Sequence, residues 1–585
     1  MIRLSIFCFC LLITALSGII QAQPYHNEWI QPDLPHARFA VTTSGVYRIP
    51  HSTIIATGLP PIGSGFQLYR NGQQVPLYAT TSGNFTPEDY LEFVGRGNDG
   101  VFDSLLFANA ADQLTTARSL FTDTAMYYLT WNNTFPAQNS RFTTVPNDIG
   151  AAPPAETFFW HTVQNTVNNQ FNPGMPFTYT GTTPVRFSGF DACEGFVGVN
   201  IGAGAIQNYN LNAAQIFTAA AEPAQLQVKL VGRSDEQAFP NDHLVQVSVN
   251  NVPYTEVAYD GFACIEVLVN LPLNVLESGA ATLNISSLGG ATAIDVNAVA
   301  YYRLIYPHSY SFNGASFFAL TLPDNAEKYL EIANFNGGSL PVLYDLTNHL
   351  RLQAIQDGGL LKYKLPQGTA TGTRNICLVN TDAGVVNAAN FTGMVQFTNF
   401  ANTANQGNFI IITPAAFTQS ANIAEQYANY RRAVPGGSHS VQVVTIEQLY
   451  HQFAYGIAKH PLAIRNFINY AVDMWATPPQ YVLLLGKGIT YNQATFNANA
   501  YNACLVPTYG VPASDALLAA RNPNQHVPQV AISRVPATNA TEAANYLEKL
   551  ITYENTQKDL FCDKTHFWRK GMLFLAQGDT GEVDV

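Results

Sequence analysis

Basic residues, closely spaced cysteines and long apolar stretches are all scarce in this sequence of 585 residues. Charged residues make up 12% of the chain, and 28 Lys and Arg stand against 40 Asp and Glu, which gives a net charge of −12. Because no basic run is present, nucleic acid is excluded as the main class of partner. Hydrophobic residues reach 47%, so sizeable cores can form, and the length suggests about three to five domains.

The cysteines are too few and too far apart to indicate a zinc site or a dense disulfide framework. Seven are present, none of them forms a Cys-x-x-Cys pair, and Cys8 and Cys10 belong to the predicted leader. We expect most of the others to be small buried side chains. These others are Cys193, Cys264, Cys377, Cys504 and Cys562.

Signatures of nucleotide binding and of serine or zinc hydrolases are also absent. The sequence has no Gly-x-Ser-x-Gly elbow and no His-Glu-x-x-His helix. The segment YVLLLGKGITYN (481–492) predicts a buried strand followed by a glycine turn. A phosphate-binding loop is excluded because Tyr481 stands where the first glycine is required and Gly488 replaces the hydroxyl residue. A dinucleotide turn is excluded because the bulky Tyr491 stands where that turn needs a small residue. Lys487 is therefore interpreted as a solvated loop residue rather than a phosphate ligand. The sequence predicts no required cofactor.

The one long apolar stretch lies at the amino terminus. Residues 1–23 carry an arginine, an apolar run from Leu4 to Ile20, and then small or polar residues, which is typical of a secretory signal cleaved near Gln23. The run has about 17 residues, so a membrane anchor is the alternative interpretation. We expect no transmembrane helix in the mature chain. The sequence therefore predicts export, to the medium or to the outer-membrane surface.

Residues 24 to about 404 predict short strands separated by polar turns. Residues that tolerate positive φ separate the strands at Asn71-Gly72, Ser44-Gly45 and Asn250-Asn251, which predicts a hairpin at each. This density of short strands favours sandwiches or jelly rolls. Soft boundaries divide the region into an amino-terminal β domain (24–150), a jelly-roll-like β domain (151–310) and a third β domain (311–404).

The pattern changes near residue 405. Buried strands such as NFIIITP alternate with helices, and Leu462 to Trp475 carries apolar residues at three- and four-residue steps. Alternating strands and helices are typical of a parallel sheet with crossover helices. The predicted fold class is therefore multidomain, with amino-terminal all-β domains followed by an α/β domain over 405–585.

The α/β segment resembles the gingipain family of cysteine peptidases, family C25. The resemblance is carried by NFIIITPAAF, GIAKHPLAIRNFINYA, PPQYVLLLGKGITYN, the Ser514-Asp515 pair and VPQVAISRVPATNATEAANYLEKLITYE. Upstream, VTTSGVYRIP, VQVSVNNVPYTEVAYDG and VLYDLTN resemble PorU-like members, the type IX secretion sortases of the Bacteroidetes. The resemblance implies a caspase-like catalytic domain, truncated in this chain. The sequence departs from the family at Lys487, where many members have Asp, and at Ser533, where Gly is common.

The catalytic dyad that the resemblance implies is not found in the chain. The family places its histidine in a His-Gly pair and its cysteine at the end of the next strand, and none of the 12 histidines here precedes glycine. We therefore expect the catalytic residues downstream of Val585. Cys562 and His566 have a spacing that suits neighbours on a helix, but neither lies where the sheet is expected to open, so a dyad of these two is disfavoured. His451 and His460 are interpreted as surface or capping residues.

Candidates for metal binding are three aspartates. Asp99 and Asp103, in GNDGVFD, could hold calcium through carboxylate oxygens, although a turn is the simpler interpretation. Asp515 falls where the resemblance implies an acidic residue after the central strand, and it is interpreted as structural or calcium-linked. Calcium, as a structural ion, is the one metal that the sequence leaves open.

The resemblance implies an exported cysteine peptidase or type IX sortase-like protein that acts on protein substrates. Type IX secretion components are the further partners that it implies, and neither nucleic acid nor nucleotide is expected. The chain by itself is expected to be inactive, because the dyad is expected beyond its last residue. The alternative is a non-catalytic surface protein whose β domains bind glycans or proteins.

Overall fold

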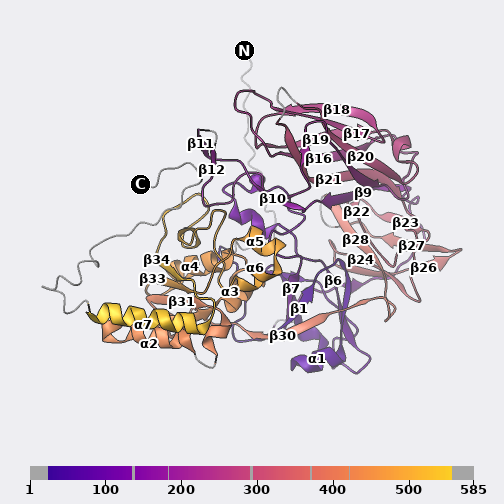
Figure 1. The fold of residues 1–585 in the computed structure, drawn as a ribbon. Helices are drawn as coiled ribbons and strands as arrows, with labels where there is room; N and C mark the ends of the chain where they lie inside the picture. The colour runs from indigo at the N-terminus through magenta and orange to yellow at the C-terminus, as the bar shows by residue number, and fades with distance from the viewer. Residues whose placement is uncertain are drawn as a thin grey trace, which may run out of the picture.

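The computed structural model of the chain describes residues 24–556, except 135–138, 182, 290–293, 369–371 and 420–421. Strands dominate up to residue 400, and strands alternate with helices after it, so the predicted multidomain fold class is confirmed (Figure 1). Among the described residues, no helix has the length and apolar character that a membrane span needs. The predicted signal peptide and the Cys562–His566 pair lie outside the described residues.

The first β region consists of two sheets that share one core, in which Phe39 and Phe66 of one sheet meet Ile49 and Phe93 of the other. A short helix, α1 (His51–Thr57), follows the second of its strands. The first sheet has the order β30 (Asn390–Gln396), β1 (Pro35–Val41), β7 (Ala125–Trp131), β3 (Phe66–Arg70), β4 (Gln73–Val75). The second has the order β29 (Asn387–Ala388), β2 (Gly45–Pro50), β6 (Tyr90–Gly95), β5 (Tyr78–Ala79).

The second β region is a sandwich of two antiparallel sheets around a core that includes Leu226, Val247 and Leu283. One sheet has the order β14 (Ile201–Gly202), β21 (Val296–Ser309), β16 (Ala224–Gly232), β19 (Cys264–Leu271), and β9 (Phe158–Thr166) also pairs with β21. The other has the order β15 (Ile206–Asn212), β20 (Ala280–Ser287), β17 (His243–Val249), β18 (Val252–Tyr259). Two small ladders join β10 (Gln170–Pro173) to β13 (Glu194–Val197) and β11 (Thr178–Thr180) to β12 (Thr183–Val185).

Two of the three predicted hairpins are confirmed. β3 and β4 pair across Asn71 and Gly72, which have φ of 48° and 76°, and β17 pairs with β18 across Asn250-Asn251. The hairpin predicted at Ser44-Gly45 is wrong. β1 pairs with β7 and β30, whereas β2 pairs with β6 and β29, so this turn carries the chain from one sheet to the facing sheet.

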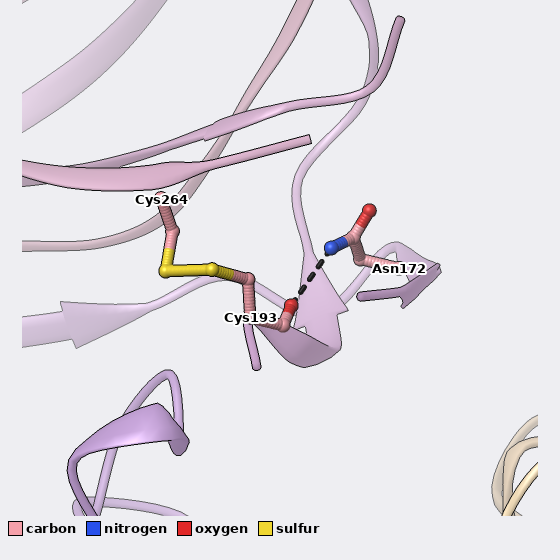
Figure 2. Close-up of a disulfide and its surroundings, with 3 residues drawn as sticks. All are labelled: Asn172, Cys193 and Cys264. Carbon is pink, nitrogen blue, oxygen red and sulfur yellow. Dashed lines mark hydrogen bonds between the residues drawn. A yellow bond between two sulfur atoms is a disulfide. The ribbon is translucent and has the colours of Figure 1, made fainter. Parts of the chain in front are cut away.

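The second β region also contains a disulfide that the sequence did not predict. Cys193 and Cys264 are bonded, with Cα atoms 5.8 Å apart (Figure 2), so the expectation of free buried thiols is wrong for these two. They are separated by 71 residues in sequence and meet because the start of β19 lies beside the start of β13. The Asn172 amide donates to the carbonyl of Cys193 over 2.7 Å. Cys377 and Cys504 are free and buried, as predicted.

The third β region packs two sheets around residues such as Leu330, Leu343 and Tyr363. Its strands cross the soft boundaries predicted from sequence, because β8 pairs here with β25, whereas β29 and β30 pair in the first β region. The larger sheet has the order β22 (Phe317–Pro323), β28 (Thr373–Asn380), β24 (Pro341–Asp345), β25 (Leu350–Gln353), β8 (Thr143–Thr144). The smaller has the order β23 (Lys328–Ile332), β27 (Leu360–Leu365), β26 (Ile355–Asp357).

The α/β region has a sheet in which all strands are parallel, in the order β32 (Val441–Thr445), β31 (Phe409–Thr413), β33 (Tyr481–Leu485), β34 (Ala531–Val535). Its helices are α2 (Ile423–Arg432), α3 (Ile446–Phe453), α4 (Leu462–Met474), α5 (Tyr491–Phe496), α6 (Ala498–Ala503) and α7 (Ala540–Thr556). The predicted central strand, β33, does pair on both sides, with β31 and with β34.

Helices cover both faces of this sheet. Ile411 and Leu483 pack in one core with α2 and α7, whereas Ile410 and Leu484 pack in another with α3 and α4 (Figure 1). The apolar stripe predicted for α4 is confirmed, since Ile464, Phe467, Ile468 and Ala471 are fully buried. The core beneath α3 and α4 continues into the first β region through residues such as Trp29 and Tyr128, so the two regions share a packed boundary.

Candidate active-site edge

The carboxyl edge of the parallel sheet is where catalytic groups gather in α/β folds, and here it begins with the glycine turn after β33. Gly486 has φ of 152°, and an added Cβ would lie 3.0 Å from Val506 Cγ2, so only glycine fits this turn. The Gly486 amide donates to the carbonyl of Val535 over 2.9 Å, and the Lys487 amide donates to that of Ala537 over 3.0 Å. The Lys487 carbonyl accepts from the Leu505 amide over 2.8 Å. The turn is therefore fixed through its backbone, and the side chain of Lys487 is partly exposed.

Arg534 of β34 ties the loops of this edge together. Its Nε and Nη2 donate to the two carboxylate oxygens of Asp515 over 2.7 and 2.6 Å. Nη1 also donates to the carbonyls of Gly486 and Val506 over 2.8 and 2.7 Å, and Nη2 to that of Pro507 over 2.9 Å. Bidentate pairing of this kind is among the stronger charge-assisted contacts. Asp515 therefore has a structural partner, because both of its carboxylate oxygens accept from the Arg534 guanidinium.

Tyr491 connects the same edge to the second β region. It opens α5 directly after the glycine turn, and its hydroxyl donates to Glu194 Oε1 over 2.5 Å. The other carboxylate oxygen of Glu194 accepts from the Asp191 amide over 2.9 Å. Burial raises the pKa of Glu194 to about 8, well above that of an exposed glutamate. The sequence showed Tyr491 only as a bulky residue, because its partner lies 297 residues away.

Neither of the two free thiols that the structure describes, Cys504 near the edge and Cys377 in the third β region, is activated. Cys504 is buried, its Sγ lies 3.7 Å from the Ile489 carbonyl, and burial raises its pKa. Burial also raises the pKa of Cys377 to about 12. Among the described residues, neither thiol makes a hydrogen bond or an ion pair with a histidine. A nucleophilic cysteine needs the opposite environment, with a lowered pKa and a neighbouring base.

Two histidines of the α/β region lie at its boundary with the first β region. His451 accepts from Arg38 Nη1 at Nε2 over 2.7 Å, and its Nδ1 lies 2.8 Å from the Tyr128 hydroxyl. Burial, with a smaller contribution from Arg38, lowers the pKa of His451 to about 3. His451 is therefore partly buried between the two regions rather than freely exposed.

His460 does act as a cap, but it is fully buried rather than exposed. Its Nδ1 accepts from the Leu462 amide at the start of α4 over 3.2 Å. Its Nε2 donates to Asp103 Oδ1 over 3.1 Å. The capping interpretation is confirmed, and the second contact gives this histidine a further role in joining the α/β region to the first β region.

The calcium candidates Asp99 and Asp103 do not converge on one site. Asp103 accepts from the Leu120 amide over 2.6 Å and from His460 over 3.1 Å, whereas Asp99 pairs with Arg70 over 3.1 Å. Within the described residues, no group of three or more His, Cys, Asp and Glu side chains is arranged to hold a metal ion. The geometry favours the turn and ion-pair interpretation over calcium binding for both residues.

Two comparisons with known proteins found matches, one to the α/β region that contains the parallel sheet and one to most of the chain, including the β regions before it. Residues 402–584 match the family model described as peptidase family C25, and a comparison with curated protein sequences found no match. The crystal structure of dimeric latent PorU from Porphyromonas gingivalis matches with a TM-score of 0.62 and 14% identity, over 93% of this chain and 52% of that one. The chain therefore spans about half the length of that PorU chain.

A smaller match concerns a carbohydrate-binding domain. The CBM36-1 domain of a multidomain xylanase from the hindgut metagenome of Trinervitermes trinervoides matches 25% of this chain and 95% of that domain, with 14% identity and a TM-score of 0.15. A TM-score this low supports no inference about function. The family match over residues 402–584 and the fold shared with PorU, in contrast, show that the chain is a gingipain- and PorU-like protein whose carboxyl-terminal part is similar to peptidase family C25.

Proposed function

We propose that this chain is part of an exported cysteine peptidase or type IX sortase-like protein that acts on protein substrates. Support comes from the family match, because family C25 is a cysteine peptidase family, and from the shared fold with PorU. Type IX secretion components are the partners that this proposal includes. A cell-surface or secreted location accompanies it.

One observation in the structure carries the proposal further. The carboxyl edge of the sheet is braced by Arg534, Asp515 and the glycine turn, yet the buried thiol beside it, Cys504, has a raised pKa and no histidine partner among the described residues. A preorganised edge without a nucleophile and base is a scaffold for groups supplied by other residues. We infer that the Cys/His dyad comes from beyond Val585, and that the 585-residue chain alone does not cleave peptides.

The test uses the 585-residue chain with a broad peptide library and an electrophilic thiol reagent. We expect no cleavage and no stoichiometric labelling of Cys504, because burial keeps it protonated. The matched variants are Cys504→Ala and Cys562→Ala. Labelling of either cysteine that accompanies cleavage, and that disappears in the corresponding variant, would overturn the inference.

A further inference from the structure

A groove of about 530 Å³ lies where the three β regions meet, and sites for small ligands commonly have volumes of about 300–1,000 Å³. Arg96, which follows β6, borders the groove from the first β region. β9 borders it through residues 159–162, and β22 and β28 border it through residues 319–323, Thr373 and Asn375. All of the lining residues precede the α/β region, so the groove is separate from the candidate active-site edge.

The groove lies over the outward faces of two neighbouring strands, β9 and β22 (Figure 1). On their inward faces, Phe159 of β9 packs with Leu320 and Leu322 of β22 in one buried core. Because side chains alternate along a strand, Trp160 and Thr321 lie on the outward faces, and both line the groove. Trp160 is 39% exposed, so part of its indole ring is free to contact a ligand.

The floor of the groove is a paired sheet face with short polar side chains. Thr321 and Asn375 are cross-strand partners in β22 and β28, and the Thr321 hydroxyl donates to Asn375 Oδ1 over 2.9 Å. Thr373, two residues before Asn375, is exposed on the same face. Among the described residues, neither the Asn375 NH₂ group nor the Thr373 hydroxyl has a hydrogen-bond partner. The floor therefore offers a ligand neutral groups that donate and accept hydrogen bonds.

The rim of the groove carries an uncompensated positive charge. Arg96 is exposed, no carboxylate is among the lining residues, and the Arg96 guanidinium makes no hydrogen bond or ion pair with another described residue. Its backbone is fixed by Tyr127, whose hydroxyl accepts from the Arg96 amide over 2.8 Å and donates to its carbonyl over 3.2 Å. Burial, with a smaller effect of the nearby His308, lowers the pKa of His161 to about 4. In a chain of net charge −12, the groove thus presents a guanidinium suited to a carboxylate.

We propose that this groove binds an acidic oligosaccharide. One sugar ring packs its apolar C–H face on Trp160, its carboxylate pairs with Arg96, and its hydroxyl groups bond to the Thr and Asn side chains of the floor. A sugar ring combines a flat apolar face with a rim of hydroxyl groups, which matches an aromatic side chain beside a neutral polar floor. An extended peptide would instead need a free strand edge or apolar pockets, whereas the floor is a paired sheet face. This site goes beyond the proposed peptidase chemistry and does not depend on it.

The experiment titrates the full chain with trigalacturonate and with a hyaluronan tetrasaccharide in a calorimeter at neutral pH. We expect saturable binding of at least one of them, weakened roughly tenfold in Arg96→Gln because a charge-assisted pair is lost. Trp160→Ala should weaken the same binding by a similar factor. The methyl ester of the bound glycan should bind the unchanged chain and Arg96→Gln equally weakly. The matched controls are Arg432→Gln on α2 and Phe239→Ala, another exposed aromatic residue of the second β region, and both should bind like the unchanged chain.

Three results would overturn the proposal. The first is no binding of either glycan at about 10 mM, a concentration at which even a weak specific site is occupied. The second is unchanged affinity in Arg96→Gln or Trp160→Ala, with circular dichroism showing that the variants are folded. The third is equally tight binding of acetyl-triglutamate, a peptide with comparable negative charge, which would assign the groove to acidic peptides. The comparison of the acid with its methyl ester uses the unchanged chain, so it tests the role of charge even if a variant fails to fold.

Discussion

At the scale of single residues, Arg534 decides how the edge of the α/β sheet is built. Its side chain contacts the glycine turn, the 506–507 segment and Asp515 together. Its side chain is 11% exposed and that of Asp515 is 26% exposed, so solvent screens this pair less than a surface pair. The sequence pointed to this position only through the family resemblance.

Replacing Arg534 with glutamine should lower the free energy of unfolding of the α/β region by about 2–3 kcal/mol, because the Asp515 carboxylate and three carbonyls lose their donor. Chemical denaturation followed by tryptophan fluorescence measures the effect. The control is Arg432→Gln, which removes a surface pair with Glu425 and should cost less than about 1 kcal/mol. Equal losses in the two variants would contradict the bracing role.

His243 is a second residue whose role the sequence did not indicate. It is fully buried, with Nδ1 2.7 Å from Asp295 Oδ1 and Nε2 2.9 Å from the Gly261 carbonyl. Because both ring nitrogens face acceptors, the ring is protonated on both. Burial alone would lower the pKa of His243, but the hydrogen bond to Asp295 and the charges of Asp242 and Asp295 outweigh it and raise the pKa above 6.5.

A raised pKa in the folded state makes the stability of the second β region depend on pH. The stabilising contribution of His243 is fully present below pH 6.5, the pKa of its imidazole in the unfolded chain. It is lost as the pH rises through the higher pKa that His243 has in the folded state. We expect the free energy of unfolding to decline over that window in denaturation series between about pH 5 and pH 9. His243→Gln should flatten this part of the profile, and a profile unchanged by the substitution would contradict the assignment.

At the scale of elements, the disulfide holds the small β10–β13 ladder against the sandwich of the second β region. Cys193 directly precedes β13, and Cys264 is the first residue of β19. Glu194, the residue after Cys193, contacts Tyr491. The cross-link therefore also fixes the strand through which the second β region reaches the α/β region.

Removing this cross-link should lower the free energy of unfolding of the second β region by about 2–4 kcal/mol, because the loop that it closes is long. The change is the double substitution Cys193→Ser and Cys264→Ser, and the measurement is denaturation with and without dithiothreitol. The reductant should destabilise the unchanged chain and leave the double variant unaffected. An effect of dithiothreitol that persists in the double variant would contradict the prediction.

At the scale of the whole molecule, export is the property that the sequence alone predicts. The arginine and apolar run of residues 1–23 indicate a signal peptide, so the mature chain should begin within a few residues of Pro24. Intact-mass analysis of the protein isolated from its native host measures this directly. A mass that retains Met1 would show that the segment is not removed.

The sequence by itself determined the features that depend on local patterns. The turn at Asn71-Gly72, the buried stripe of α4 and the strand at 481–485 followed from backbone preference and from apolar spacing, which act over a few residues. For the same reason the change from β to α/β near residue 405 was visible without a structure. The resemblance to family C25 rested on similar short segments.

Only the tertiary structure decided which distant segments meet. Local pattern does not distinguish a hairpin from a crossover, so the turn at Ser44-Gly45 was placed within one sheet although it joins two. Spacing likewise says nothing about the Cys193–Cys264 bond or about the contact between Glu194 and Tyr491, whose partners are 71 and 297 residues apart. These contacts depend on long-range packing, because burial and charge pairing are set by neighbours in space rather than along the chain.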